Sequence, residues 1–233
     1  AIAPAALIPG SFCSPELLAH ILYSKYVQAV PLYRQEKDYA ACGAKLSRQT
    51  MSNWVIWASV NKAKPVFDIM KKILLALHVI HADETIVQVL HEPGKKAKTD
   101  SRMWVYCTDK SADRYIVLFE YSPTRNGDNA ARFLGEYSGY LVCDGYDGYN
   151  KLQKVTGCGC WAHARRKFVE ALPTDKELVS TSKAAKGVNL INEIYTIERS
   201  FDGLDPEEKH KQRQERLKPA LDVFFAWLET VNA

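Results

Sequence analysis

The sequence lacks a long hydrophobic run, and this absence excludes a membrane-spanning protein. Its N-terminal stretch, AIAPAALIPG, is apolar, but it is short, contains two prolines and has no basic flank. A membrane-spanning helix needs about 20 mostly apolar residues, and a secretion signal needs a basic segment ahead of its apolar one. We therefore expect neither a signal peptide nor a membrane partner, and we expect the chain to be cytoplasmic.

The sequence also lacks a dense set of cysteines and a strong charge imbalance. Net charge is +4, from 31 basic and 27 acidic residues, which permits a nucleic-acid partner without arguing for one. Hydrophobic residues make up 47%, as in an ordinary globular protein, so the composition does not favour disorder. Without a secretion signal, scattered cysteines indicate free thiols in a reducing cytoplasm. The six cysteines are Cys13, Cys42, Cys107, Cys143, Cys158 and Cys160.

The first region of the chain, residues 1–77, carries helical patterns. Gly43 marks a turn between two of its helices. In the helix after this turn, apolar residues recur at i, i+3, i+4 and i+7, and the polar face carries Arg48, Gln49 and Asn53. A helix, a turn and a polar-faced helix form the layout of a helix-turn-helix, whose second helix reads DNA. A helical hairpin with a packing role alone is the alternative, and the sequence leaves both open.

Residues 78–172 change to the pattern of strands. Three β-branched and apolar runs, beginning near His78, Arg102 and Arg114, precede a helical stretch, DNAARFLGEY, and a fourth strand, GYLVCDG. The order strand, strand, strand, helix, strand predicts an antiparallel meander, after which a right-handed crossover lays the fourth strand parallel to the first. Residues 173–233 return to helical spacing. We expect an α/β fold with a mixed sheet, preceded and followed by helical regions.

Two aspartates interrupt these strands at positions that strand propensity disfavours. Asp83 lies inside the first strand and Asp144 ends the fourth. If the strands are neighbours, two carboxylates about 4 Å apart repel by about 4 kcal/mol at an effective dielectric near 20. A divalent cation between them, or protonation of one, makes the pair tolerable, and Mg²⁺ and Mn²⁺ take carboxylate oxygens as ligands. The pair favours metal-assisted phosphoryl transfer, against the alternative of two separate structural aspartates.

A Cys-x-x-His pair follows the second aspartate in GCGCWAHARRKF. The pair is Cys160 and His163, with Cys158 nearby. A structural zinc site needs four ligands, usually from two such pairs, and no second pair is evident in the sequence. We therefore do not expect zinc in this segment.

Three basic residues, Arg165, Arg166 and Lys167, come directly after this pair on a predicted helix. Cations at this place suit the phosphate backbone of DNA, which attracts positive charge without base reading. A solvated helix surface is the equal alternative. A tyrosine recombinase is not favoured, because no cluster of arginine and histidine surrounds Tyr146 and Tyr149 in the sequence.

Five motifs, in one order between Ile8 and Glu198, carry a resemblance to a known family. They are IPGSFCSPELLAHILYSKYVQAVPLYRQE, LSRQTMSNWV, LHVIHADETIVQVL, LVCDGYDGYNKL and GCWAHARRKF. The sequence resembles the transposases of the insertion-sequence-66 family of bacterial mobile elements. The resemblance implies an RNase H-like fold and DNA as the partner, both as transposon ends and as target. It also implies a homo-oligomer on DNA, accessory proteins of the element, and association with the nucleoid.

The resemblance further implies DDE chemistry. Three acids hold two Mg²⁺ or Mn²⁺ ions, water cleaves the transposon end, and the freed 3′-OH attacks target DNA. The first acid corresponds to Asp83 and the second to Asp144, with Asp147 as the weaker candidate for the second. Cys160 and His163 correspond to a signature that follows the second acid near the active site.

The third acid of the family has no clear match in this sequence. In the family it follows a helical insertion, which residues 173–233 resemble in part, so we expect it beyond Ala233. Glu198 is the stand-in within the chain, and Glu193 is the weaker one. Two rival functions stay open: a non-catalytic DNA-binding remnant of a transposase, and an RNase H-like nuclease without strand transfer.

Overall fold

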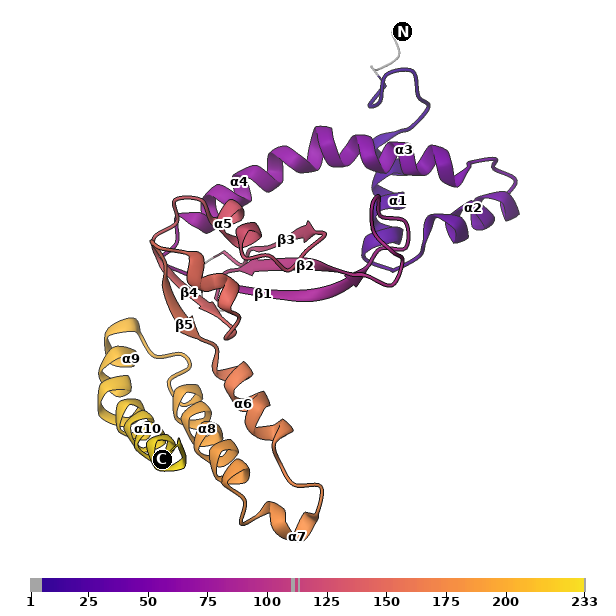
Figure 1. Ribbon diagram of the computed structural model, residues 1–233. Coiled ribbons are helices and arrows are strands. Elements are labelled where there is room, and N and C mark those ends of the chain that lie inside the picture. Colours follow the sequence, from indigo (N-terminus) through magenta and orange to yellow (C-terminus); the bar gives the residue numbers. More distant parts are fainter. Residues whose placement is uncertain (1–5, 110–111, 113, 233) are drawn as a thin grey trace. The chain divides into compact units, whose positions relative to one another are not determined.

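The computed structural model describes residues 6–109, 112 and 114–232 of a chain that divides into two compact units. The first unit is residues 1–77 and the second is residues 78–233. Figure 1 shows the elements of both, coloured along the sequence. No helix within the described part is long and apolar enough to cross a membrane.

The first unit is built of helices, as the sequence predicts. They are α1 (Pro15–Tyr26), α2 (Leu32–Ala41), α3 (Arg48–Ala58) and α4 (Lys64–Leu75). Ser14 and Ser47 cap α1 and α3, because the hydroxyl of each accepts a hydrogen bond of 3.1 Å from a first-turn N–H. A π-helical turn, η1 (Ser59–Ala63), joins α3 to α4 ahead of Pro65, which has no N–H to donate. The core of the unit includes Ile21 and Met51, both fully buried.

A five-stranded mixed sheet forms the centre of the second unit (Figure 1). Its order is β3-β2-β1-β4-β5, in which β1 pairs antiparallel with β2 and parallel with β4. The predicted order of elements and the parallel pairing of the fourth strand with the first are confirmed. The strands are β1 (Val79–Gln88), β2 (Asp100–Cys107), β3 (Val117–Ser122), β4 (Tyr140–Cys143) and β5 (Thr156–Gly159).

The fifth strand, β5, corrects the sequence analysis, which ended the sheet at the fourth. Its four residues read TGCG, and glycine is depleted in strands, so the local pattern gave no strand signal. β5 forms because β4 offers it a parallel partner, with Leu141 in register with Gly157 and Cys143 with Gly159. Tertiary pairing thus overrides local propensity at this edge of the sheet.

Helix α5 (Asp128–Leu134) packs on the buried face of the sheet. The ring of Phe133 stacks on that of Tyr106 in β2, with 3.7 Å between ring centroids and 5° between planes. Leu141 of β4 and Trp104 of β2 are buried in the same unit. This packing fixes β4, and with it Asp144, against the centre of the sheet.

The start of α5 touches the loop that follows Asp144. This loop contains a short 3₁₀ helix, η2 (Asp147–Lys151). A Cβ atom at Gly127 would lie 2.3 Å from the carbonyl oxygen of Gly148, which is backbone and cannot rotate away. Only glycine therefore allows the two segments to approach this closely.

We expect Gly127→Ala to lower the free energy of unfolding by about 1–3 kcal/mol, the usual cost of overpacking. Urea unfolding followed by circular dichroism measures the loss. Gly157→Ala in β5 is the matched control, because an added Cβ there meets nothing within 4 Å. Equal losses in the two variants would show that the contact between α5 and η2 is not the cause.

Helices alone occupy the described residues from 161 onward, and the helical prediction for residues 173–233 is confirmed for the described part, through residue 232. Helices α6, α8 and α10 share one apolar core that includes Trp161, Phe168, Ile191 and Phe224. The sequence motif GCWAHARRKF thus leads from the sheet into this helical region. The helices are α6 (Trp161–Glu170), α7 (Lys176–Val179), α8 (Lys183–Arg199), α9 (Pro206–Gln212) and α10 (Lys218–Asn232), with a π-helical turn, η3 (Arg213–Leu217), before α10.

Candidate active site

Of the two predicted acids, Asp83 lies on β1 and Asp144 directly follows β4, the parallel neighbour of β1. The register pairs His81 of β1 with Val142 of β4. Continued by two residues, it sets Asp83 level with Asp144, which directly follows β4. β1 is also the central strand of the sheet. The side chain of Asp83 is 55% exposed and that of Asp144 is 22% exposed. The distance between their carboxylates stays a prediction.

Both carboxylate oxygens of Asp144 face a partner. Oδ1 accepts a hydrogen bond of 3.0 Å from the backbone N–H of Tyr146, which closes a turn of the kind that aspartate favours. Oδ2 lies 3.7 Å from Nη2 of Arg125, within reach of an ion pair. The turn chemistry of the sequence DGY is therefore present, and it orients the carboxylate of Asp144.

Glu84, the residue after the first acid, is a buried carboxylate that the sequence analysis missed. Its side chain is only 2% exposed. Oε1 accepts a hydrogen bond of 2.7 Å from Nε of Arg125 and forms an ion pair with Nη2, 2.5 Å away. Oε2 accepts a hydrogen bond of 3.1 Å from the hydroxyl of Tyr149. Alternation along a strand places Glu84 and Asp83 on opposite faces, which is the only sequence signal that separates the two roles.

The two tyrosines of DGYDGY surround this ion pair. The guanidinium carbon of Arg125 lies 4.1 Å from the ring centroid of Tyr146, and the hydroxyl of Tyr146 donates to the carbonyl oxygen of Arg125. The ring of Tyr149 packs edge-on against that of Trp104, with 5.9 Å between centroids. Burial, followed by the charge of Glu84, raises the pKa of Tyr149, so this phenol stays protonated and remains a donor.

His163 lies beside the first acid. Its Nε2 is 3.7 Å from Oδ2 of Asp83, and its Nδ1 is buried without a hydrogen-bond partner. Cys160 stands at the N-cap of α6, and its backbone N–H donates to the carbonyl oxygen of Cys143 at 2.8 Å. The end of the sheet therefore leads directly into α6 and carries His163 to the acids. Among the residues that the structure describes, no group of three or more His, Cys, Asp or Glu side chains is close enough to hold a metal ion.

The basic triplet divides into one packed residue and two exposed ones. Nε of Arg165 donates to Oδ1 of Asn192 at 2.8 Å, which ties α6 to α8. Arg166 is exposed, and Lys167 is exposed beside Glu170, with 2.9 Å between Nζ and Oε2. Two of the three cations are thus available to a polyanion.

The remaining predicted residues lie elsewhere in the fold. Glu198 of α8 accepts hydrogen bonds from Arg213 on both carboxylate oxygens, and these bonds lower the pKa of Glu198. In the first unit, the side-chain amide of Gln49 donates a hydrogen bond of 3.0 Å to Oδ1 of Asn53 on α3. Both side chains are exposed. Arg48 begins the same helix, with its backbone N–H donating to Glu36 at 2.9 Å.

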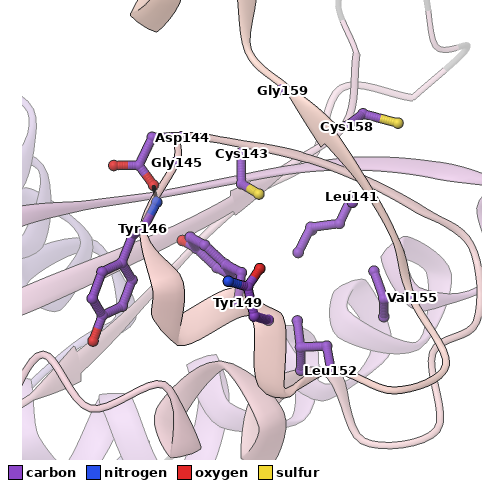
Figure 2. A pocket seen from close by; sticks show the side chains of 12 residues that line it. Leu141, Cys143, Asp144, Gly145, Tyr146, Tyr149, Leu152, Val155, Cys158 and Gly159 are labelled. Carbon is purple, nitrogen blue, oxygen red and sulfur yellow. Dashed lines mark hydrogen bonds between the residues drawn. The ribbon is translucent and has the colours of Figure 1, made fainter.

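Asp144 borders two hollows. The larger, of about 860 Å³, has Asp144, Arg125, His163, Lys167 and Trp161 among its lining residues. The smaller, of about 360 Å³, is shown in Figure 2, where Leu141 and Val155 lie away from Asp144 across the cavity. The larger hollow brings Asp144, His163 and two exposed cations, Arg125 and Lys167, to a common space.

Cys143 lines the smaller hollow as an uncharged side chain. Burial raises the pKa of Cys143 to about 11, so this thiol is neutral near pH 7. A neutral thiol is a poor metal ligand.

The chain that carries these two aspartates matches the model of one known protein family. Residues 10–233 match the model of the transposase IS66 family. The chain therefore belongs to the IS66 family of transposases, which confirms the resemblance and supports a role in DNA transposition. No solved structure matches the chain.

Curated relatives occur in Sinorhizobium fredii. They are three uncharacterized proteins, y4hP, y4jD and y4qI, which are 31%, 31% and 32% identical to the chain. The matches cover 99%, 94% and 97% of this chain and 45%, 44% and 43% of the relatives. The chain thus spans less than half the length of these relatives.

Proposed function

We propose that the chain carries the first two acids of a DDE-type transposase, which cleaves DNA at transposon ends and joins the freed ends to target DNA. The observation that carries the proposal is the placement of Asp83 on β1 and of Asp144 directly after β4, the parallel neighbour of β1, in a chain of a transposase family. The order β3-β2-β1-β4-β5, with β2 alone antiparallel to the other strands, supports an RNase H-like core.

Asp83 and Asp144 are the residues that would hold Mg²⁺ or Mn²⁺. Their chemistry fits these ions, because both offer carboxylate oxygens and neither is sealed from solvent. Bound divalent ions would stabilise the charge that develops on the attacking and leaving oxygens of a phosphodiester. A third carboxylate would complete the set, and we propose that it comes from residues C-terminal to Ala233.

The other predicted residues support the proposal through DNA contact. His163 and Lys167 line the larger hollow with Asp144, so a phosphate next to the acid would meet an imidazole and a cation. Arg166 extends the exposed positive charge along α6. On α3, the polar side chains Gln49 and Asn53 are exposed, as a DNA-reading helix requires. We further propose that the protein acts on the nucleoid as a homo-oligomer, with accessory proteins of the element.

The test uses a transposase that carries this chain at the full length of its relatives, with DNA that bears the ends of the element. We expect cleavage and joining to require Mg²⁺ or Mn²⁺ and to stop when EDTA removes the ion. DNA of equal length with scrambled ends is the control. Cleavage without joining would favour the nuclease, and DNA binding without cleavage would favour the non-catalytic remnant.

A further inference from the structure

Arg125 lies outside every motif that the sequence analysis singled out, yet it connects the two strands that carry the acids. It stands in the loop between β3 and α5 and contacts Glu84, next to the first acid, and Asp144, the second. We infer that Arg125 is a positioning residue, which is clamped by buried Glu84 and holds the carboxylate of Asp144 in place. The inference rests on the proposed function for the role of Asp144.

The clamp on Arg125 is strong because Glu84 has no access to water. A buried carboxylate is costly unless it is paired and hydrogen-bonded. Oε1 of Glu84 accepts a hydrogen bond from Nε of Arg125 and lies in ion-pair contact with Nη2. Oε2 of Glu84 accepts a hydrogen bond from the hydroxyl of Tyr149. Both oxygens are therefore satisfied, and the position of the guanidinium is set by the interior of the unit rather than by solvent.

The same guanidinium reaches the second acid. Nη2, which lies 2.5 Å from Oε1 of Glu84, also lies 3.7 Å from Oδ2 of Asp144. Oδ1 of Asp144 is held from the other side by the N–H of Tyr146. Tyr146 in turn stacks on Arg125 and donates to its carbonyl oxygen. The network leaves Asp144 with one preferred orientation, as positioning around a metal ligand requires.

This network also couples the two acids. Asp83 and Glu84 are adjacent in β1 and point to opposite faces of the sheet. Asp83 offers its carboxylate to the proposed site, while Glu84 fixes Arg125 and, through it, Asp144. One dipeptide of the central strand therefore sets the position of both acids. The tyrosines of DGYDGY, at positions 146 and 149, serve the same network.

Direct contact between Arg125 and DNA is the competing role. The side chain of Arg125 is 44% exposed and lines the larger hollow. However, Nε donates to Oε1 of Glu84 and Nη2 lies 2.5 Å from the same oxygen, so one edge of the guanidinium is engaged by the buried carboxylate. The geometry therefore favours a role through Asp144.

The experiment uses Arg125→Lys, which removes the planar guanidinium group and keeps the positive charge. Two quantities are measured on the chain: the exchange rate of the Tyr146 amide by NMR without metal, and the affinity for Mn²⁺ by calorimetry. We expect the Tyr146 amide, which donates to Asp144, to exchange faster, and Mn²⁺ to bind about 10–100-fold more weakly, the usual cost of losing a partner of a metal ligand. Amides in the pairing of β1 with β2 should keep their exchange rates.

The matched control is Arg132→Lys, which alters another arginine–carboxylate contact of the same unit. In that contact, Nη2 of Arg132 lies 3.4 Å from Oε1 of Glu120. This control variant should change neither quantity. If Arg125→Lys does not fold, Tyr149→Phe tests the same network, because it removes one hydrogen bond from Glu84 and leaves Arg125 intact. It should shift both quantities in the same direction, by less.

The outcomes separate the inference from the proposed function. Unchanged exchange and unchanged Mn²⁺ affinity in Arg125→Lys would overturn the inference and leave the proposed function standing. In the full-length transposase, a raised KM for DNA with unchanged kcat and Mn²⁺ affinity would assign Arg125 to DNA contact and also overturn it. Faster exchange at Tyr146 in a chain that binds no Mn²⁺ would support the positioning of Asp144 and contradict the proposed function.

Discussion

Asp144→Asn is expected to slow the cleavage of transposon-end DNA by at least about 10²–10³-fold, the cost of losing one group that stabilises the transition state. The amide of asparagine matches the shape of the carboxylate and can still accept the N–H of Tyr146, but it carries no negative charge. Mg²⁺ and Mn²⁺ are hard cations that bind carboxylates in phosphoryl-transfer sites. Single-turnover cleavage by the full-length transposase, at saturating Mn²⁺, measures the effect on the chemical step.

Asp147→Asn is the matched control for this prediction. Asp147 belongs to the same DGYDGY stretch, but it is exposed at the start of η2. Asp147 also lines the larger hollow, but it lies beyond the end of β4 rather than directly after it. Its replacement should therefore slow cleavage far less than Asp144→Asn does. If Asp147→Asn causes the large loss and Asp144→Asn does not, the second acid has been assigned to the wrong residue.

DNA binding is expected to survive Asp144→Asn. Binding rests on Lys and Arg side chains that release counterions from the phosphate backbone, and its affinity falls steeply as salt rises. Removing one acid from the larger hollow does not remove any of those cations. A salt titration of binding should therefore give the same slope for the variant and the wild type. A changed slope would show that the substitution had disturbed the DNA-binding surface.

The neighbouring placement of the two aspartates could be predicted from the sequence because its signal is local. Each aspartate breaks an apolar strand pattern at a position that strand propensity disfavours, and the order of elements brings the first and fourth strands together. The parallel pairing of β1 with β4 follows this logic. Predicting this placement requires only the alternation of residues along each strand and the direction of the crossover between the third and fourth strands.

The anchor of the second acid could not be found in this way. Glu84 and Arg125 are 41 residues apart, and nothing in the local sequence of either one points to the other. Strand alternation places Glu84 on the face opposite Asp83, but it does not say what it meets there. The contact exists because the loop between β3 and α5 brings Arg125 next to Glu84 of β1, and that path is a tertiary property.

The basic triplet on α6 shows a second limit of sequence reasoning. Three consecutive cations look equivalent in the sequence, yet Arg165 donates to Asn192 of α8 while Arg166 is exposed. The difference depends on the side of α6 that α8 covers. Spacing predicts that a helix forms, but the partner helix decides which cation is free to meet DNA.

The 233-residue chain alone is expected to bind DNA and to cleave its ends at least about 10²–10³-fold more slowly than the full-length transposase, because one charge-stabilising ligand is worth about that much. Two carboxylates, Asp83 and Asp144, make up the proposed ligand set within the described residues, where no group of three ligating side chains occurs. Cleavage and filter-binding assays on the two proteins, at equal Mn²⁺, measure the difference.

Glu198→Gln in the full-length protein decides whether the stand-in acid is the third ligand. Arg213 donates hydrogen bonds to both carboxylate oxygens of Glu198, and Nζ of Lys209 lies 3.7 Å from Oε1 of Glu198. A carboxylate so engaged has a structural partner already, so the substitution should leave the cleavage rate unchanged. It should lower the free energy of unfolding by about 1 kcal/mol or less, as for other partly exposed ion pairs.

The opposite result would place the third acid within the chain. If the 233-residue chain cleaves as fast as the full-length protein and Glu198→Gln abolishes cleavage, Arg213 must release Glu198 when DNA and metal bind. If Glu198→Gln has no effect in a chain that cleaves, Glu193 is the next residue to replace, since it is exposed on the same helix. Either outcome would assign the third acid to α8 rather than to the residues after Ala233. The proposed set of metal ligands near the end of β4 would then include a residue of α8.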